Sequence, residues 1–200
     1  SNQGFGKWEV SLATLETPDD PTSAATQGRS LFVISTGGIQ PGVVPTGTVR
    51  FVIDGTPQAG QEGDIITIRG EGFGTATVEA DTAGGNDSIW IDIGAPLQLG
   101  LATGDGDDDV RVDNGRPEWF SEIEYISIDT GGGNDTLVVD AQTAQPFGGF
   151  PGGVRAAVAD VNLGEGNDVA DIKIEGLTEL SLNLTAGAGR DTVLIDTRII

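Results

Sequence analysis

The sequence predicts an all-β fold, a parallel β-solenoid preceded by a small N-terminal β segment. Three observations predict it: a glycine turn phrase recurs from residue 75 onward, an apolar alternating segment precedes each copy, and no helical period of useful length occurs. Gly accounts for 32 of 200 residues, about twice average usage, and Pro for 9. Because there is no collagen period, the excess glycine is expected in turns.

The N-terminal part offers three strand candidates, and loop-like segments rich in Pro, Gly and Thr separate them. Acid is unevenly placed, since residues 1–62 carry a net charge of −3 and residues 63–200 carry −18. We therefore expect a boundary near residues 58–64, with 1–62 as a cap or a small β-sandwich-like module and 63–200 as the solenoid. An arrangement in which the N-terminal strands form the first coils of the solenoid stays open. The strand candidates are residues 7–15, 30–36 and 48–54.

Five copies of one phrase, x-G-x-G-[ND]-D-x-U-x-[IV]-D with U apolar, follow in the second part. A degenerate sixth copy without its Asp is expected at GEGFGTATV (70–78). Each unit reads as strand, glycine turn, strand and return loop, and return loops of variable length are typical of a stacked solenoid. The five copies are TAGGNDSIWID (82–92), TGDGDDDVRVD (103–113), TGGGNDTLVVD (130–140), LGEGNDVADIK (163–173) and AGAGRDTVLID (186–196).

The turn phrase combines conformational freedom with oxygen donors. Glycine adopts φ > 0 without strain, which lets the chain turn with its carbonyls pointing inward. The Asp that follows places a carboxylate beside these carbonyls. Ligation by oxygen alone in a flexible loop suits Ca²⁺ better than Mg²⁺, which demands a tighter octahedron.

These residues resemble the RTX family of calcium-binding nonapeptide repeats, over roughly residues 70–200. The resemblance implies a β-roll in which Ca²⁺ ions lie between the turns of adjacent coils. Copies here are 21 to 33 residues apart instead of nine, so one row of ions at most is expected, and Arg190 is a candidate to replace the metal in the last turn. The candidate metal ligands are Asp87, Asp108, Asp135, Asp168 and Asp191, with Asn86, Asp105, Asp107, Asn134, Asn167, Gly85, Gly106, Gly133 and Gly166 around them.

Plainer interpretations exist for each of these features. An Asp in a single turn caps its own backbone in an Asx-turn, and the trailing Asp92, Asp113, Asp140 and Asp196 are expected to end strands at the surface instead of forming a second metal row. Residues 45–57 resemble a strand pair of bacterial Ig-like modules over a short stretch, and residues 65–78 resemble a strand-turn-strand of IPT modules. Trp90 and Trp119 are candidates for ligand contact, and Trp90 is expected to face outward. Asp81, Asp129 and Asn162 are candidates for a short ladder or for ordinary solvated positions.

The overall charge excludes several classes of partner. With 31 acidic and 10 basic residues, a net charge of −21 disfavours nucleic acid and anionic membranes and favours metal cations. Disulfides and His-based catalysis are excluded because Cys and His are absent, and nothing points to an enzyme. No apolar stretch is long enough for a membrane span, and no signal peptide is visible.

The sequence thus predicts a secreted or cell-surface bacterial module that folds on binding Ca²⁺. An alternative is a self-assembling filament, sheath or surface-layer subunit. The sequence stops at LIDTRII, in or just after a strand, so an uncovered coil is expected either to continue in a longer chain or to pair with an identical subunit. A second alternative is an adhesin that binds a glycan or a protein through its loops.

Overall fold

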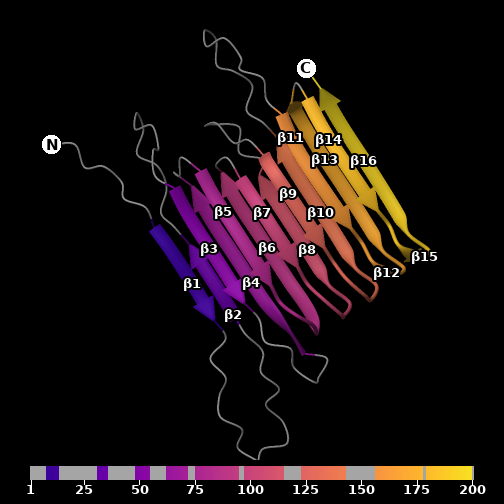
Figure 1. The fold of residues 1–200 in the computed structure, drawn as a ribbon, viewed down its shortest axis with the longest axis horizontal. Helices are drawn as coiled ribbons and strands as arrows, with labels where there is room; N and C mark the ends of the chain where they lie inside the picture. The colour runs from indigo at the N-terminus through magenta and orange to yellow at the C-terminus, as the bar shows by residue number, and fades with distance from the viewer. Residues whose placement is uncertain are drawn as a thin grey trace, which may run out of the picture.

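The chain forms a parallel β-solenoid. In the computed structural model, the residues described contain strands and no helix, and these strands build two seven-stranded parallel sheets (Figure 1). The predicted fold class is therefore confirmed, and no helix among these residues is long and apolar enough to cross a membrane. The structure describes residues 8–13, 31–35, 48–54, 62–71, 75–94, 97–114, 123–142, 156–177 and 179–199.

The chain alternates between the two sheets, so that consecutive strands of one sheet are neighbours in space. Sheet A contains β1 (Trp8–Ala13), β3 (Thr48–Asp54), β5 (Thr75–Asp81), β7 (Leu97–Ala102), β9 (Ile123–Asp129), β11 (Ala156–Asn162) and β14 (Glu179–Thr185). Sheet B contains β2 (Leu31–Ser35), β4 (Glu62–Glu71), β6 (Asn86–Gly94), β8 (Asp109–Asn114), β10 (Thr136–Gln142), β13 (Val169–Leu177) and β16 (Thr192–Ile199). Two short strands, β12 (Glu165–Gly166) and β15 (Ala188–Gly189), pair at the turns.

The core lies between the sheets and is built from rows of aligned apolar residues. Successive residues of a strand point to opposite faces, so every second residue reaches the core. Ile89, Val110, Leu137 and Ala170 are consecutive register partners in sheet B, and each is at most 1 % exposed. This stacking buries the apolar alternation that the sequence shows in each unit.

The N-terminal strands belong to the same two sheets. β1 pairs with β3 and β3 with β5, while β2 pairs with β4 and β4 with β6, all in parallel. Strand pairing thus continues across the boundary expected near residue 62, and the division of the chain into two parts at that boundary stays a prediction.

The expected sixth copy at residues 70–78 is wrong. This segment begins in β4 of sheet B, which ends at Glu71, and continues in β5 of sheet A, which begins at Thr75. The five true copies run the other way, from sheet A to sheet B. The connection from β4 to β5 therefore runs between the sheets in the opposite direction to the aspartate turns.

Candidate functional site: a row of buried aspartates

The five glycine turns stack over one another on one edge of the solenoid. Ten glycines of the described chain have positive φ, including Gly133 at 138°. A Cβ on Gly133 would lie 1.9 Å from the carbonyl oxygen of Gly106 in the preceding coil. Glycine is therefore required for two reasons, its left-handed backbone and the close approach of neighbouring coils.

The aligned aspartates form one continuous hydrogen-bonded row, which we call the aspartate ladder. In each step the backbone amide of one Asp donates to Oδ1 of the aligned Asp in the next coil. The distances are 2.8 Å for Asp87 to Asp108, 3.0 Å for Asp108 to Asp135, 2.9 Å for Asp135 to Asp168 and 3.1 Å for Asp168 to Asp191. The five aspartates predicted from the sequence are thus brought together, one in each coil.

A second row runs beside the ladder on the solvent side, with the opposite donor direction. Asp107 N donates to Oδ1 of Asn86, Asn134 N to Oδ1 of Asp107, and Asn167 N to Oδ1 of Asn134, at 2.7 to 3.0 Å. All four side chains are exposed. These four residues were predicted as metal ligands, and in the structure their Oδ1 atoms connect coils. The row ends where the amide of Arg190 donates to Asn167.

A threonine lies beside each of three ladder aspartates, Asp87, Asp108 and Asp135. Thr82, Thr103 and Thr130 are fully buried, and each hydroxyl donates to a carbonyl of the next coil. Thr82 also donates to Oδ2 of Asp87. Because a hydroxyl carries a single proton, it can serve the carbonyl or the carboxylate at one time, but not both. The fourth and fifth copies have Leu163 and Ala186 at this position, so they lack the hydroxyl.

Burial makes the charged form of the ladder costly. Asp87, Asp108, Asp135 and Asp168 are each at most 3 % exposed. Desolvation raises the pKa of Asp108 to about 7; the Thr103 hydroxyl and the Asp87 amide oppose the rise, and the charges of Asp87 and Asp135 add to it. Desolvation is also the largest cause that raises the pKa of Asp87 and Asp135. The row therefore favours either protons or a compensating cation.

Three ladder oxygens have no hydrogen-bond partner. These are Oδ2 of Asp108, Asp135 and Asp168, all buried. For the first two this holds while the Thr103 and Thr130 hydroxyls donate to carbonyls of the next coil instead of to the carboxylates. A buried carboxylate oxygen without a donor is unfavourable unless a proton or a cation compensates it. Among the residues that the structure describes, no group of three or more acidic side chains converges on a metal site, so a cation would also need backbone or water oxygens, which Ca²⁺ accepts readily.

The turn carbonyls are not left free for a cation, because backbone amides of neighbouring coils already donate to them. The carbonyls of Asp105, Gly132 and Glu165 accept the amides of Gly85, Gly106 and Gly133 at 2.6 to 2.8 Å. A carbonyl oxygen has two lone pairs, so each of these carbonyls retains one. The donor set of carboxylate and carbonyl oxygens thus fits Ca²⁺ in chemical type. Of the four aspartates in residues 105–109, only Asp108 is buried in the ladder.

Asp64 is a sixth member of the ladder, which the repeat phrase does not predict. Its side chain is 7 % exposed, and its amide donates to Oδ1 of Asp87 at 2.5 Å. The preceding Gly63 packs so closely on Asn86 that a Cβ there would lie 1.9 Å from the Asn86 carbonyl oxygen. A signal existed, because the Gly-Asp pair lies 23 residues before Asp87, within the spacing of the other copies. The threonines were also missed, although three copies share them.

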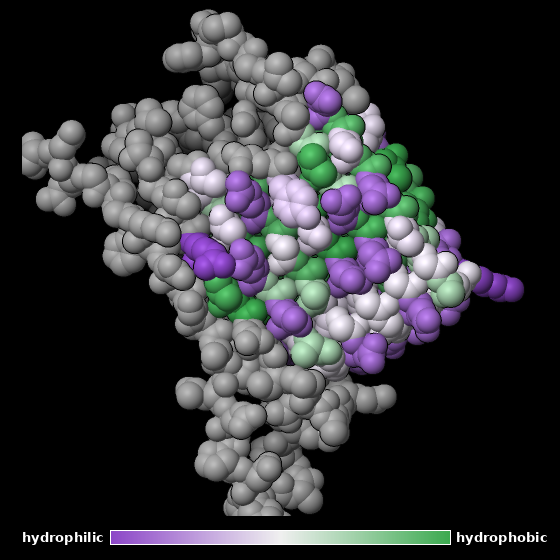
Figure 2. Space-filling model, in the orientation of Figure 1, coloured by the Kyte–Doolittle hydropathy of each residue, from purple (hydrophilic) through white to green (hydrophobic). Residues whose placement is uncertain are grey.

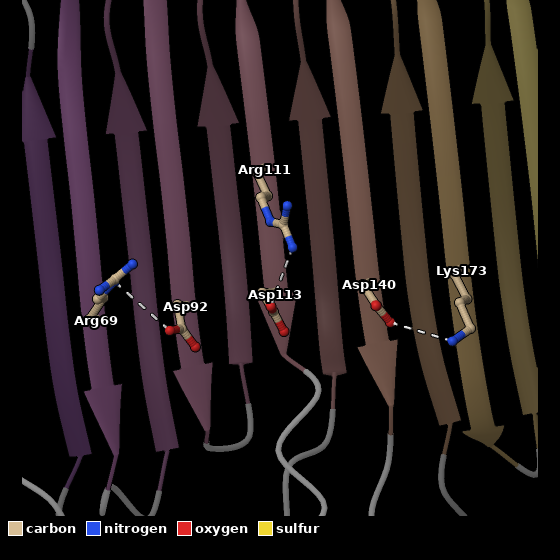
Figure 3. Close-up of polar contacts among 6 residues, drawn as sticks. All are labelled: Arg69, Asp92, Arg111, Asp113, Asp140 and Lys173. Carbon is tan, nitrogen blue, oxygen red and sulfur yellow. Dashed lines mark ion pairs between the residues drawn. The ribbon is translucent and has the colours of Figure 1, made fainter.

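The trailing aspartates lie within strands on the outer face of sheet B, not at strand ends. Asp92, Asp113 and Asp140 are consecutive register partners. Each has a cation within 4.0 Å, as Figure 3 shows: Arg69 for Asp92, Arg111 for Asp113 and Lys173 for Asp140. Burial, followed by the charge of Asp113, raises the pKa of Asp92, and the two arginines oppose this. Each of these three aspartates therefore has a basic side chain beside it.

The remaining candidates fall outside the ladder. Trp90 is half-buried on the outer face of sheet B, and the guanidinium of Arg69 lies 3.7 Å from its ring centroid, in a cation–π contact. Trp119 lies outside the described residues. Of the expected short ladder, Asn162 donates its side-chain amide to Asp129 at 3.0 Å. Asp81 and Asp129 each accept the amide two residues later, as in Asx-turns.

Comparison with known proteins assigns the chain to no family. No protein-family model, no curated protein and no solved structure matches the chain.

Proposed function

We propose that this chain is a structural module whose solenoid is stabilised by Ca²⁺ bound along the aspartate ladder. The observation that carries the proposal is the set of three buried carboxylate oxygens without a partner, on Asp108, Asp135 and Asp168. They lie in consecutive coils of a chain with net charge −21. A bound Ca²⁺ ion would supply the positive charge that this row lacks.

The ladder residues have complementary roles in this proposal. Oδ1 of each Asp from Asp87 to Asp191 accepts the amide of the preceding coil, which fixes the carboxylate. Oδ2 of Asp108, Asp135 and Asp168 would then be left to face the cation. Turn carbonyls and water would complete the oxygen shell. Since the metal would join carboxylates of different coils, its binding free energy would add to the free energy of folding.

The same proposal includes the family of the chain and its location in or outside the cell. We infer a relationship to the RTX calcium-binding repeats, supported by the glycine–aspartate turns and the parallel solenoid. Extracellular calcium modules bind with Kd on the order of 10⁻⁴–10⁻³ M. Such a site would be empty in the cytosol and filled outside the cell, so a secreted or cell-surface role, without catalysis, fits the proposal.

Direct binding measurements test the proposal with a matched pair of variants. Calcium binding is measured by equilibrium dialysis for the parent chain, for Asp108→Asn and for Asp107→Asn. Asp108 is buried in the ladder, whereas its neighbour Asp107 is exposed in a row where three of the other four copies have Asn. We expect Asp108→Asn to lose bound Ca²⁺ and Asp107→Asn to keep it. Equal loss in both variants, or no binding to the parent chain at millimolar Ca²⁺, would refute the proposal.

A further inference from the structure

The first four copies of the turn phrase differ in one buried position, five residues before the ladder aspartate. Thr82, Thr103 and Thr130 occupy this position in the first three copies, and Leu163 occupies it in the fourth. All four residues are fully buried, and the backbone amide of each donates to a carbonyl of the next coil at 2.8 to 3.0 Å. The backbone at this position is therefore held in the same way in each coil, and only the side chain changes.

Each threonine hydroxyl lies close to two acceptors. One is a carbonyl of the next coil, at 2.9 to 3.2 Å, and the other is the carboxylate of the ladder aspartate in the same coil. The Thr82 hydroxyl also donates to Oδ2 of Asp87. Burial raises the pKa of Asp108, and the Thr103 hydroxyl opposes the rise, as Thr130 does for the aspartate of its own coil. Since a hydroxyl proton rotates to suit its surroundings, it can turn to the carboxylate whenever that oxygen has no other partner.

Asp168 has no such donor. Its side chain is fully buried, Oδ1 accepts the amide of Asp135 at 2.9 Å, and Oδ2 has no hydrogen-bond partner. Leu163, at the threonine position, offers only apolar atoms. The outside of the turn edge is hydrophilic, at the lower right of Figure 2, but the Asp168 side chain is buried beneath it. A buried carboxylate oxygen without a donor is costly. Of the three unpartnered ladder oxygens, Oδ2 of Asp168 is therefore the one that no hydroxyl can serve.

We propose that the threonine hydroxyls are built-in substitutes for the cation, and that Ca²⁺ stabilises the solenoid most at Asp168, where this substitute is missing. The inference rests on the proposed function and assigns its principal site. When a threonine turn is empty of metal, the hydroxyl proton compensates Oδ2, so that a cation must replace an existing hydrogen bond. At Asp168 the empty site has nothing to replace. A cation there therefore gains more free energy on binding, and that free energy adds to the stability of the fold.

A matched pair of variants at residue 163 tests the role of the hydroxyl. Threonine and valine have nearly the same shape, so Leu163→Thr and Leu163→Val leave similar space beside Asp168 and differ by one hydroxyl group. The thermal midpoint Tm of each variant is measured by circular dichroism at pH 7, in chelator and in millimolar Ca²⁺. We expect the rise in Tm on adding Ca²⁺ to be smaller for Leu163→Thr than for Leu163→Val by roughly 2–4 °C, the effect of about one hydrogen bond in a chain of this size.

Two further variants test the same inference without changing residue 163. Thr130→Val removes the hydroxyl beside Asp135, so the rise in Tm on adding Ca²⁺ should be larger than in the parent chain. Asp168→Asn keeps the Oδ1 acceptor and removes the charge, and it should reduce this rise more than Asp135→Asn does. If neither variant at residue 163 folds, these two comparisons decide the question.

The outcomes separate this inference from the proposed function. If Ca²⁺ leaves the Tm of the parent chain unchanged, the proposed function fails, and the cation at Asp168 fails with it. If Ca²⁺ raises the Tm of the parent chain but the two Leu163 variants respond equally, only this inference is overturned. A larger rise for Leu163→Thr than for Leu163→Val would also overturn it, since the hydroxyl oxygen would then act as a metal ligand instead of a substitute for the metal.

Discussion

The backbone amide of Asp108 donates to Oδ1 of Asp135 at 3.0 Å, although 27 residues separate them. The same contact recurs across separations of 21, 33 and 23 residues. The difference in length is taken up in the return loops, so the ladder keeps its geometry while the loops vary. The aspartate ladder therefore sets the register of the coils at the turn edge, independently of loop length.

Substituting a turn glycine should disrupt the stacking of coils. We expect Gly133→Ala to destabilise the fold by ~3 kcal/mol or more, because its Cβ would lie 1.9 Å from the Gly106 carbonyl oxygen and its φ is 138°. Gly100→Ala is the control, since a Cβ at Gly100 meets nothing within 4 Å. Urea unfolding of both variants measures the difference. Similar midpoints for the two would argue against close packing at the turns.

The first turn contains a position that should be improved by glycine. Ala83 has a φ of 67°, and it is the one non-glycine residue with positive φ in the described chain. The left-handed conformation costs a residue with a Cβ roughly 1–2 kcal/mol. We expect Ala83→Gly to raise the free energy of unfolding by about 0.5–1 kcal/mol after the entropy cost of glycine. A lower thermal midpoint would show that this strain is absent in solution.

Without metal, the fold should become more stable as the pH falls from 7 towards 5. Burial raises the pKa of Asp108 from 3.8 to about 7, so between pH 5 and 7 the folded chain holds a proton that the unfolded chain has already released. The free energy of unfolding therefore falls as the pH rises from the unfolded pKa to the folded pKa, by up to about 1.4 kcal/mol per pH unit for this one proton. Below the unfolded pKa the stabilisation by the proton is complete. Urea midpoints in chelator at pH 7, 6 and 5 measure this. Urea midpoints that decrease as the pH is lowered from 7 to 5 would contradict the account. In Asp108→Asn the urea midpoint should change less with pH than in the parent chain.

Neutralising one ladder residue should have opposite effects with and without calcium. Asp135→Asn keeps the Oδ1 acceptor for the Asp108 amide and removes a buried charge whose Oδ2 has no partner. In chelator we expect a gain on the order of 1 kcal/mol. In millimolar Ca²⁺ the variant should be less stable than the parent chain, because one cation site is lost. Thermal unfolding under both conditions detects the reversal, and the same sign in both would speak against a cation at Asp135.

The sequence was sufficient to predict the solenoid and the main ladder. Alternating apolar segments and an aligned Gly-x-Gly phrase predict strands and turns locally, and the repeat predicts their stacking. The alignment of the five copies therefore predicts that Asp87, Asp108, Asp135, Asp168 and Asp191 form one row.

What the sequence left unresolved depends on contacts between coils. Asp64 was missed because its turn lacks the Gly-x-Gly phrase, and only pairing with Asp87 reveals it. Residues 70–78 were misassigned because glycine marks turns on both edges, and only the order of the sheets tells these edges apart. Likewise, the structure alone shows that Asn134 holds a neighbouring coil through its side chain.

Far-UV circular dichroism during a Ca²⁺ titration of the chelator-treated chain tests the central claim most directly, with Mg²⁺ as control. The account predicts a gain of β signal, and a rise in thermal midpoint, with Ca²⁺ and not with Mg²⁺ at the same concentration. A chain that is fully β-rich in chelator at pH 7, with a midpoint unmoved by millimolar Ca²⁺, would contradict it. The aspartate ladder would then be a neutral structural element, held by its own hydrogen bonds.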